Sequence, residues 1–276
     1  MISRCVMGHQ PEMSNPIRIL LFSSLYPNCE QPHFGLFVEN RLRKLIAYGG
    51  VEARVVAPVP WFPFGWRCLG SYAKFARVPS EEIRHSLSID HPRFIRLPKI
   101  GMNRAPSDMA RASLDVLKRI SGEGFDFDLI DAHYFYPDGV AAVRLGEALG
   151  RPVVITARGT DINLLPKFPG PRAQIIEAAH KAAGIITVSR ALKESIVSLG
   201  IPADKITVLR NGVDLEFFVP STDRQKLRQE LSMSRRTLLS VGNLIELKGH
   251  HLIIEAMQSL PDTDLFVIGG GERQGM

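Results

Sequence analysis

Short runs of Val, Ile and Leu alternate with amphipathic segments between residues 17 and 209, and this alternation limits the fold more than any other feature. Continuous apolar runs are typical of strands that are buried on both faces of a sheet. When such strands alternate with helices, the strands run parallel and the helices cover the sheet. We therefore predict an α/β, doubly wound domain. Strands are expected at 17–23, 51–60, 127–133, 152–157, 184–189 and 205–209, with helices at 38–49, 108–120, 138–150, 172–184 and 190–200.

The alternation restarts after Pro220 but supplies only two more strands. Helices are predicted at 223–231 and 250–260, and strands at 236–242 and 264–271. An ordinary doubly wound domain needs roughly 100 residues or more, so this part indicates only the beginning of a second Rossmann-like domain. We expect a disordered leader at 1–15, a complete first domain at 16–218 and an incomplete second domain at 219–276.

The segment NGVDLEFFVP at 211–220 lies between the two alternations. Asn211-Gly212 is a strong turn signal, but two adjacent phenylalanines and a proline are unusual in a solvated linker. We interpret the segment as the joint between two α/β domains, with the functional cleft beside it.

Charge and cysteine content narrow the class of protein. The net charge of +6 favours acidic partners such as phosphates, anionic lipids or nucleic acid, without choosing among them. Three cysteines without a C-x-x-C pair are typical of reduced thiols, which favours the cytoplasm. No apolar run approaches the roughly 18–20 residues that span a bilayer.

Several catalytic signatures are missing from the sequence. It contains no nucleophile elbow, no G-x-x-x-x-G-K-[ST] loop and no zinc-spaced Cys/His set, which excludes most hydrolases and P-loop enzymes. Nucleic acid is disfavoured because no helix-turn-helix, zinc-finger or RNP-like motif accompanies the positive charge.

Polar residues follow two neighbouring predicted strands of the first domain. Asp131 and His133 end one strand, and Asp138 is expected to be the N-cap of the next helix. Arg158, at the end of the following strand, could hold a phosphate or carboxylate, and Asp161 lies in the polar loop after it. Ligands of open α/β sheets bind at this edge. The alternatives are a hydrogen-bonded structural histidine and a turn stabilised by Asp161.

Two glycine-containing motifs mark the second domain. In SVGNLIELKGH at 240–250, Lys248-Gly249 opens a helix, where an ammonium and the helix N-terminus could hold one phosphate group. The alternative is an exposed lysine at a helix start. The glycines at 269–271 follow a strand and could let a phosphate approach the backbone, although a bare turn explains them as well.

Aromatic and basic residues cluster in the segment between the second and third expected strands. The WFPFGWR segment at 61–67 suits a membrane interface or a lipid-like acceptor. The alternative is a flap packed on its own domain. The basic residues that follow are Arg84, Arg93, Arg96, Lys99, Arg104 and Arg111.

Taken in order, these pieces resemble the retaining, GT-B-fold glycosyltransferases of family 4. The resemblance runs from about residue 17 to residue 271. It is carried by YP…PHFGLFV, DLIDAHYFYPDG, ITARGTDIN, VSRALKESI, KITVLRNGVDLEFFVP and VGNLIELKGH. It implies two Rossmann-like domains that clamp a nucleotide-sugar, the first on the acceptor side and the second binding the donor. It also implies that Phe217 and Phe218 pack at the joint.

The resemblance assigns roles to individual residues. It places Gly35 in a loop that meets donor phosphate and acceptor, and His133, the catalytic candidate, near the transferred sugar. Arg158, Asp161 and Asp138 are cleft or acceptor residues, while Asn211 and Gly212 are structural. Many members have His where Arg158 stands and Arg where Asn243 stands, and the family's E-x7-E segment would lie beyond Met276. The donor-binding candidates are Gly35, Asn243, Lys248 and Gly249.

The function that the resemblance implies is transfer of a sugar, with retention, from a nucleotide diphosphate sugar to a saccharide or lipid-linked acceptor in polysaccharide or glycolipid biosynthesis. No metal or further cofactor is expected. We expect a cytoplasmic protein and leave open a peripheral contact with anionic lipid at the inner face of the membrane. The alternative is an inactive, truncated remnant or binding fragment of such an enzyme. A GT-B-fold epimerase has no positive support.

Overall fold

The structure is a computed structural model that describes residues 15–61, 72–95 and 101–271. The chain divides into two compact units, Met1–Asn211 and Gly212–Met276, which are described separately. The predicted leader, apart from residue 15, lies outside the described residues, as does all of the aromatic segment after Trp61.

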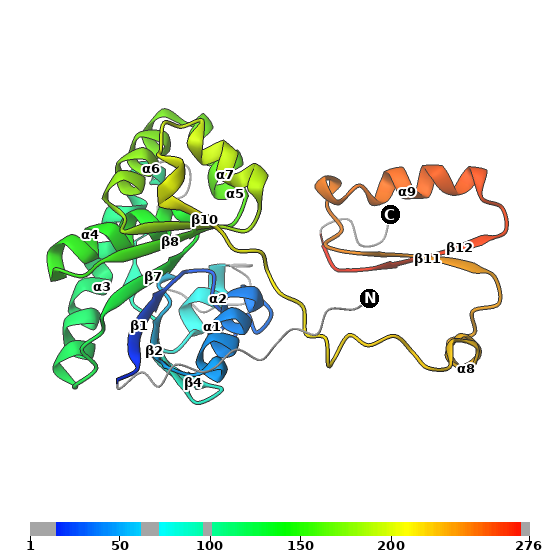
Figure 1. Cartoon of the computed structure of the whole chain (residues 1–276), viewed down its shortest axis with the longest axis horizontal. Helices are drawn as coiled ribbons and strands as arrows, with labels where there is room; N and C mark the ends of the chain where they lie inside the picture. The colour runs from blue at the N-terminus through cyan, green and yellow to red at the C-terminus, as the bar shows by residue number, and fades with distance from the viewer. Residues whose placement is uncertain (1–14, 62–71, 96–100, 272–276) are drawn as a thin grey trace. The chain divides into compact units, whose positions relative to one another are not determined.

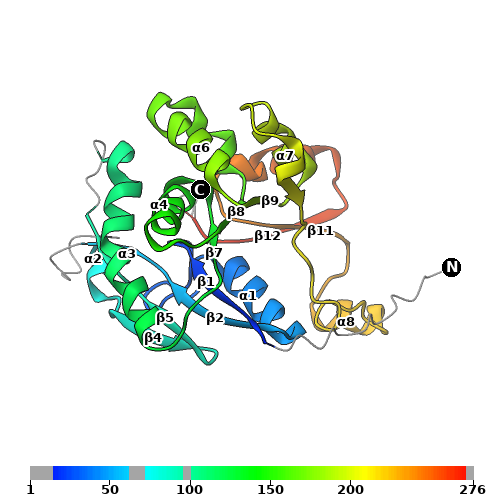
Figure 2. The same ribbon diagram turned by 60° about the vertical axis from the view of Figure 1, so that its left-hand side comes forward.

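The first unit is built on one large sheet. Its strands are β1 (Ile17–Phe22), β2 (Val51–Val56), β4 (Glu81–Arg84), β5 (Leu87–Asp90), β7 (Leu129–His133), β8 (Val153–Ala157), β9 (Gly184–Thr187) and β10 (Ile206–Val208). Their order is β10-β9-β8-β7-β1-β2-β5-β4 (Figures 1 and 2). All neighbours are parallel except β4 and β5. The predicted doubly wound sheet is confirmed. Two short strands, β3 (Val59–Pro60) and β6 (Arg93–Phe94), form a separate parallel pair.

Helices connect these strands, and three of them end at a glycine or begin at a serine cap that the sequence provides. They are α1 (Leu36–Tyr48), α2 (Tyr72–Arg77), α3 (Ala105–Gly122), α4 (Val140–Leu149), α5 (Thr160–Asn163), α6 (Pro169–Lys181) and α7 (Arg190–Val197). As predicted, α1 and α4 end at glycines with positive φ, Gly49 at 100° and Gly150 at 65°, a backbone region that glycine adopts without strain. Ser189 caps α7 by accepting a hydrogen bond from the Leu192 amide.

Two clusters of buried apolar side chains cover opposite faces of the sheet. Alternate residues of one strand point to opposite faces, so Leu20 and Phe22 of β1 join one cluster and Leu21 joins the other. The first, larger cluster is completed by α3, α4, α6 and α7, and the second by α1. Figures 1 and 2 show α3 and α4 on one side of β7 and β1, and α1 on the other.

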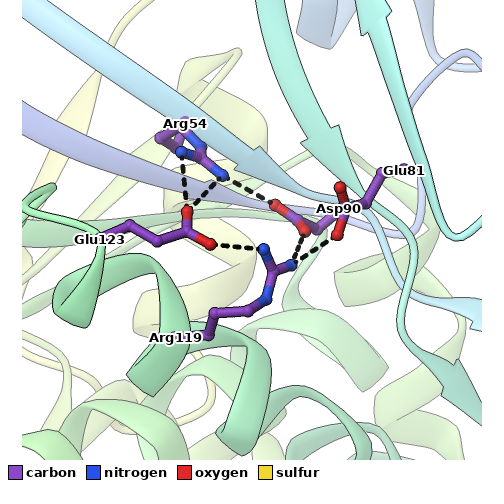
Figure 3. A network of polar contacts seen from close by, with 5 residues as sticks. All are labelled: Arg54, Glu81, Asp90, Arg119 and Glu123. Atoms are coloured by element: carbon purple, nitrogen blue, oxygen red, sulfur yellow. Dashed lines mark hydrogen bonds and ion pairs between the residues drawn. The ribbon is translucent and has the colours of Figure 1, made fainter.

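An ion-pair network fastens the β4–β5 edge to the rest of the unit (Figure 3). The carboxylate of Asp90, at the end of β5, pairs with Arg54 of β2 and with Arg119 of α3. Arg119 also pairs with Glu81 of β4, 3.0 Å away, and with Glu123, 2.8 Å away. Because Asp90 is buried, removing either arginine would leave a charge with fewer partners in a poorly solvated position.

The basic segment after residue 84 folds onto its own unit where it is described. Arg84 pairs with the buried Glu39 of α1 at 3.0 Å. The guanidinium of Arg93 donates to the backbone carbonyls of Phe75 and Val78. For these two arginines the structure supports the alternative interpretation of a packed flap. Arg96 and Lys99 lie outside the described residues.

The second unit is smaller and its apolar side chains stay exposed. Strands β11 (Arg236–Val241) and β12 (Thr263–Ile268) pair in parallel, and helices α8 (Arg224–Glu230) and α9 (His250–Ala256) precede and connect them. Among the residues of this unit that the structure describes, only His250 is buried. No helix in the described part of the chain is long and apolar enough to cross a bilayer.

The two phenylalanines expected at the joint belong to the second unit, and their packing there stays a prediction. Within that unit Phe217 and Phe218 are 76% and 65% exposed, and their rings contact each other edge to face at 4.9 Å. A local turn precedes them, in which the Asp214 carboxylate accepts hydrogen bonds from the backbone amides of Glu216 and Phe217.

Candidate active site

The candidate site lies where the strand order of the first sheet reverses. From β1 the chain continues to β2 on one side of the sheet and later returns to β7 on the other. In open α/β sheets the ends of two such strands diverge and leave room for a ligand. Here the ends are joined by a hydrogen bond of 3.0 Å from the Ser23 hydroxyl to the carbonyl of His133.

His133, the last residue of β7, is buried and both of its ring nitrogens are engaged. The Arg158 guanidinium lies 2.5 Å from Nδ1, and the Asp131 carboxylate lies 3.2 Å from Nε2. A guanidinium can only donate and a carboxylate can only accept, so Nδ1 accepts and Nε2–H donates. Burial lowers the pKa of His133, and the positive charge of Arg158 adds to this although Asp131 opposes it. The imidazole is therefore neutral, with a fixed tautomer.

Asp131 completes this buried arrangement from within β7. Burial alone would raise the pKa of Asp131, but His133 and the guanidiniums of Arg41 and Arg158 hold it below its ordinary value. The carboxylate stays ionised and fixes the orientation of the imidazole, as carboxylates commonly do for histidines at functional sites.

Arg158 is the partly exposed cation of the site. Its guanidinium lies 4.8 Å from the centre of the Phe37 ring, a cation–π contact. Besides its contact with His133, it donates to the Asn211 side chain at 3.2 Å. Burial lowers the pKa of Arg158 to about 10, and neighbouring Arg41 contributes, so the charge persists at neutral pH. The guanidinium is held in one orientation and can meet an anionic group.

Asp161 holds the backbone around these side chains. Its buried carboxylate accepts hydrogen bonds from the amides of Phe135 at 2.7 Å, Gly159 at 2.7 Å and Arg158 at 3.1 Å. Burial raises the pKa of Asp161, while the three amides oppose the rise. The alternative interpretation, a turn stabilised by Asp161, describes this geometry. Asp161 thus fixes the backbone on which Arg158 is carried, and its part in a cleft stays a prediction.

Asp138 does not cap a helix, which corrects the prediction. Residues Phe135–Gly139 form a wider helical turn, and α4 starts after Gly139. The Asp138 side chain instead reaches the loop after β1 and accepts a hydrogen bond from the Ser24 amide. Burial raises the pKa of Asp138 to about 7, with the charge of Asp161 adding to the rise. Through this hydrogen bond the Asp138 carboxyl links the segment after β7 to the loop after β1.

Gly35 permits the close approach of two backbone segments. It precedes α1 with φ of 73°, and a Cβ at this position would lie 2.2 Å from the Leu25 carbonyl oxygen. The position therefore requires glycine for packing, whatever its part in donor binding.

Helix α1 contributes two site residues that sequence reasoning missed. Phe37 stacks on Arg158, and Arg41 donates to the Thr156 hydroxyl at 2.8 Å. Their spacing of four residues places them on one face of the helix. This spacing, directly after the glycine motif, is the signal that could have identified them.

In the second unit the predicted donor-binding residues follow β11. Asn243 and Lys248 are exposed, and Gly249 precedes α9 with φ of 67°. Among the described residues none pairs with the Lys248 ammonium. His250, which the sequence analysis did not select, is held by the Ser240 hydroxyl at 2.9 Å and the Asn243 carbonyl at 3.2 Å. His250 thereby fixes the loop that carries Lys248. Its position at the start of a helix, directly after Gly249, is the sequence feature that could have identified it.

The glycines after β12 have a packing reason of their own. A Cβ on Gly269 would lie 1.8 Å from the Gly242 carbonyl oxygen, and one on Gly271 would lie 2.9 Å from that of Leu244. These contacts explain the glycines without a phosphate. In the described part of the chain no cluster of His, Cys, Asp and Glu could hold a metal ion, and the expected absence of a cofactor stays a prediction.

Comparison with known families decides the class of this chain. The family described as Glycosyltransferase Family 4 matches residues 36–217, which is well over half of the sequence. The chain belongs to glycosyltransferase family 4.

Two proteins named for polysaccharide synthesis are among the family 4 chain's relatives. TuaC of Bacillus subtilis, named as a teichuronic acid biosynthesis glycosyltransferase, is 29% identical over 259 residues, covering 92% of this chain and 65% of TuaC. AmsK of Erwinia amylovora, an amylovoran biosynthesis glycosyltransferase, is 26% identical over 199 residues, covering 69% of this chain and 47% of AmsK.

A solved structure shows the same fold. Anabaena HepE, crystallised with UDP and glucose, matches with a TM-score of 0.61 at 18% identity, covering 94% of this chain and 62% of HepE. The predicted α/β, GT-B-like fold class is confirmed. The family 4 chain thus spans about half to two thirds of the length of the proteins that it resembles.

Proposed function

We propose that this family 4 chain binds a nucleotide diphosphate sugar and transfers the sugar, with retention, to a saccharide or lipid-linked acceptor in polysaccharide or glycolipid biosynthesis. The names of TuaC and AmsK support the biosynthetic setting. Structures of HepE with UDP-glucose and with UDP and glucose support the donor class.

The observation that carries the proposal is the Arg158–His133 pair at the reversal of strand order. A guanidinium presents a rigid fork of donors that suits phosphate and carboxylate. Neutral His133 accepts a hydrogen bond from the Arg158 guanidinium, and the Phe37 ring stacks on the same guanidinium. The fork of Arg158 is therefore oriented before a ligand arrives. This preorganisation avoids an ordering cost on binding.

The two catalytic demands of sugar transfer are stabilisation of the leaving diphosphate and of the oxocarbenium-like centre. Fixed cations and dipoles meet such demands when they are oriented in advance. We assign the diphosphate to Lys248, with Asn243 and Gly249 beside it, and an anionic group of donor or acceptor to Arg158. His133 has no free ring nitrogen in this arrangement and acts by positioning Arg158.

Donor binding is the first test. Calorimetric titration of the chain with a panel of nucleotide diphosphate sugars should identify a donor, and Lys248→Ala should weaken its binding by roughly 1.5–3 kcal/mol, the scale of a charge-assisted hydrogen bond. Lys226→Ala is the matched control, because Lys226 is also an exposed lysine of the second unit. Equal affinities for the parent and both variants would remove Lys248 from the site.

The transfer itself needs a second assay. Release of nucleoside diphosphate should depend on the acceptor, and nuclear magnetic resonance of the product should show the anomeric configuration of the donor. An inverted product would overturn the retaining mechanism. Arg158→Lys keeps the positive charge but loses the planar fork of donors. It should lower kcat/KM and leave the melting temperature close to that of the parent.

A further inference from the structure

Two segments that contact each other near the candidate site carry exposed apolar side chains together with basic ones. The apolar members are Met102, Leu164 and Phe168, which are 42%, 44% and 44% exposed. The basic members are Arg104, Lys167 and Arg172, all exposed. We call these six side chains the apolar–basic patch.

Two segments that are distant in sequence build this patch. The side-chain amide of Gln174 donates to the backbone carbonyl of Asn103 at 3.1 Å, and the Asn103 side chain packs directly against Gly170. The Tyr136 hydroxyl donates to the Met102 carbonyl at 2.5 Å. These contacts fix residues 101–104 next to the start of α6, so the patch belongs to the rigid part of the first unit.

The patch carries positive charge without compensation. Its two segments, 101–104 and 163–173, contain no Asp or Glu. Among the described residues no carboxylate pairs with Arg104, Lys167 or Arg172. The nearest acids in sequence are Asp161, which is buried, Asp108, which is half-buried in the first turn of α3, and Glu177, which is exposed in α6 and pairs with Lys181 at 2.8 Å.

We propose that the apolar–basic patch binds the surface of an anionic lipid bilayer. Exposed apolar side chains can enter the boundary between headgroups and acyl chains, while the surrounding cations meet lipid phosphates. Protein interfaces differ in their lysine content, because lysine is depleted there relative to the rest of the surface. Here Lys167 lies directly beside Phe168, an arrangement that suits headgroups better than a dry protein contact.

The patch also bears on the acceptor, an extension that rests on the proposed function. Leu164 directly follows α5, which contains Asp161, and Asp161 fixes the backbone of Arg158. A lipid-linked acceptor held in the bilayer would therefore meet the protein at the edge that carries the candidate site. Vesicle binding does not require sugar transfer, so the two proposals fail separately.

Sedimentation with vesicles tests the proposal. One set contains phosphatidylcholine alone and the other an equal mixture of phosphatidylcholine and phosphatidylglycerol. The parent should bind the anionic set and release as salt rises, since screening weakens surface electrostatics. Lys167→Gln with Arg172→Gln should lower the partition coefficient about 25-fold, about fivefold per charge. Leu164→Ser with Phe168→Ser should lower it about tenfold or more.

Matched controls separate the patch from general charge and hydrophobicity. Lys118→Gln with Lys226→Gln removes the same charge from exposed positions elsewhere. Ile83→Ser removes a side chain that is 79% exposed but follows Glu81 and Glu82. Both controls should bind within about twofold of the parent, and circular dichroism should confirm that all variants fold. The proposal is wrong if the parent binds both vesicle sets equally or neither, or if the patch variants bind as tightly as the parent.

Discussion

The two units contain strands of the same apolar type, but only the first unit buries them. Ile130 of β7 and Ile155 of β8 are fully buried, whereas Leu239 of β11 and Val267 of β12 are 63% and 38% exposed. The difference is in the neighbours. β7 and β8 lie inside an eight-stranded sheet under α3, α4 and α6, whereas in the described part of the chain β11 and β12 pair only with each other. Burial depends on what packs on a strand, and the strand pattern alone does not provide it.

This contrast extends to the functional residues. In the first unit, Arg158, His133 and Asp161 are fixed by buried hydrogen bonds at the edge of a packed sheet. In the second, Lys248 is exposed on a loop held by His250. We infer that the first unit is preorganised and that the second is held more loosely. The following experiments test that inference.

The largest difference should come from truncating one phenylalanine in each unit. Phe22→Ala in β1, where the ring is fully buried, should lower the free energy of unfolding by about 3–5 kcal/mol. Phe266→Ala in β12, where the ring is 44% exposed, should cost less than about 1 kcal/mol. Urea denaturation followed by far-ultraviolet circular dichroism measures both losses, because the backbone signal comes from both units. Equal shifts for the two variants would remove the contrast.

Alanine substitutions at two glycines of the first unit test how tightly the loop before α1 is packed. Gly35 and Gly50 have nearly equal φ, 73° and 71°, but only a Cβ at Gly35 meets another backbone segment. Gly50→Ala should cost about 1 kcal/mol from backbone strain alone, and Gly35→Ala roughly 2–4 kcal/mol because the Leu25 carbonyl must move. Similar losses in the two melting curves would mean that the loop adjusts freely.

The pH dependence of stability should distinguish the units as well. The pKa of Asp138 is about 7 when folded, above its ordinary value of 3.8, so the folded state takes up a proton between these values. Its contribution to stability is then greatest at low pH and is lost as the pH rises towards 7. The side chain of the Asp138→Asn variant does not titrate. The free energy of unfolding of the variant, relative to that of the parent, should therefore rise by roughly 1–3 kcal/mol between pH 4 and 7.

The control for that experiment is a variant of the second unit that removes no ionisable group. Leu252→Ser, in α9, should give a difference from the parent that stays flat over the same range. The lowered pKa of His133 is common to all three proteins and cancels. A flat profile for Asp138→Asn would show that Asp138 has an ordinary pKa.

The smallest effect is expected at the segment between the units. Phe217→Ser and Phe218→Ser should each change the unfolding free energy of the first unit by less than about 0.5 kcal/mol, because both rings are exposed. Differential scanning calorimetry can measure this. A loss above about 1 kcal/mol would instead support the expectation that these rings pack at the joint.

The pattern of apolar runs was sufficient for the central strands and for the helix ends at Gly49 and Gly150, because local chemistry determines both. It missed β4 and β5, whose sequences EEIR and LSID are short and partly polar. Those strands depend on long-range contacts, above all the pairing of Asp90 and Glu81 with Arg119, which no local pattern contains.

For the site, strand ends were the useful signal. Parallel strands finish at one edge of a sheet, so His133 and Arg158 were expected together and do meet. The engagement of both ring nitrogens of His133 could not be predicted, because it depends on side-chain directions. Asp138 was misjudged because Gly139 occupies the cap position and the carboxylate turns to Ser24.

Hydrogen exchange measured by mass spectrometry tests the central contrast most directly. Amides of β1, β7 and β8 should exchange slowly, through global unfolding of the first unit, and those of residues 238–268 should exchange orders of magnitude faster, through local opening. Phe22→Ala should speed exchange in β7 and leave residues 238–268 unchanged. Slow exchange across 238–268 that matches β7 would contradict the account, because it would show that the second unit is as firmly held as the first.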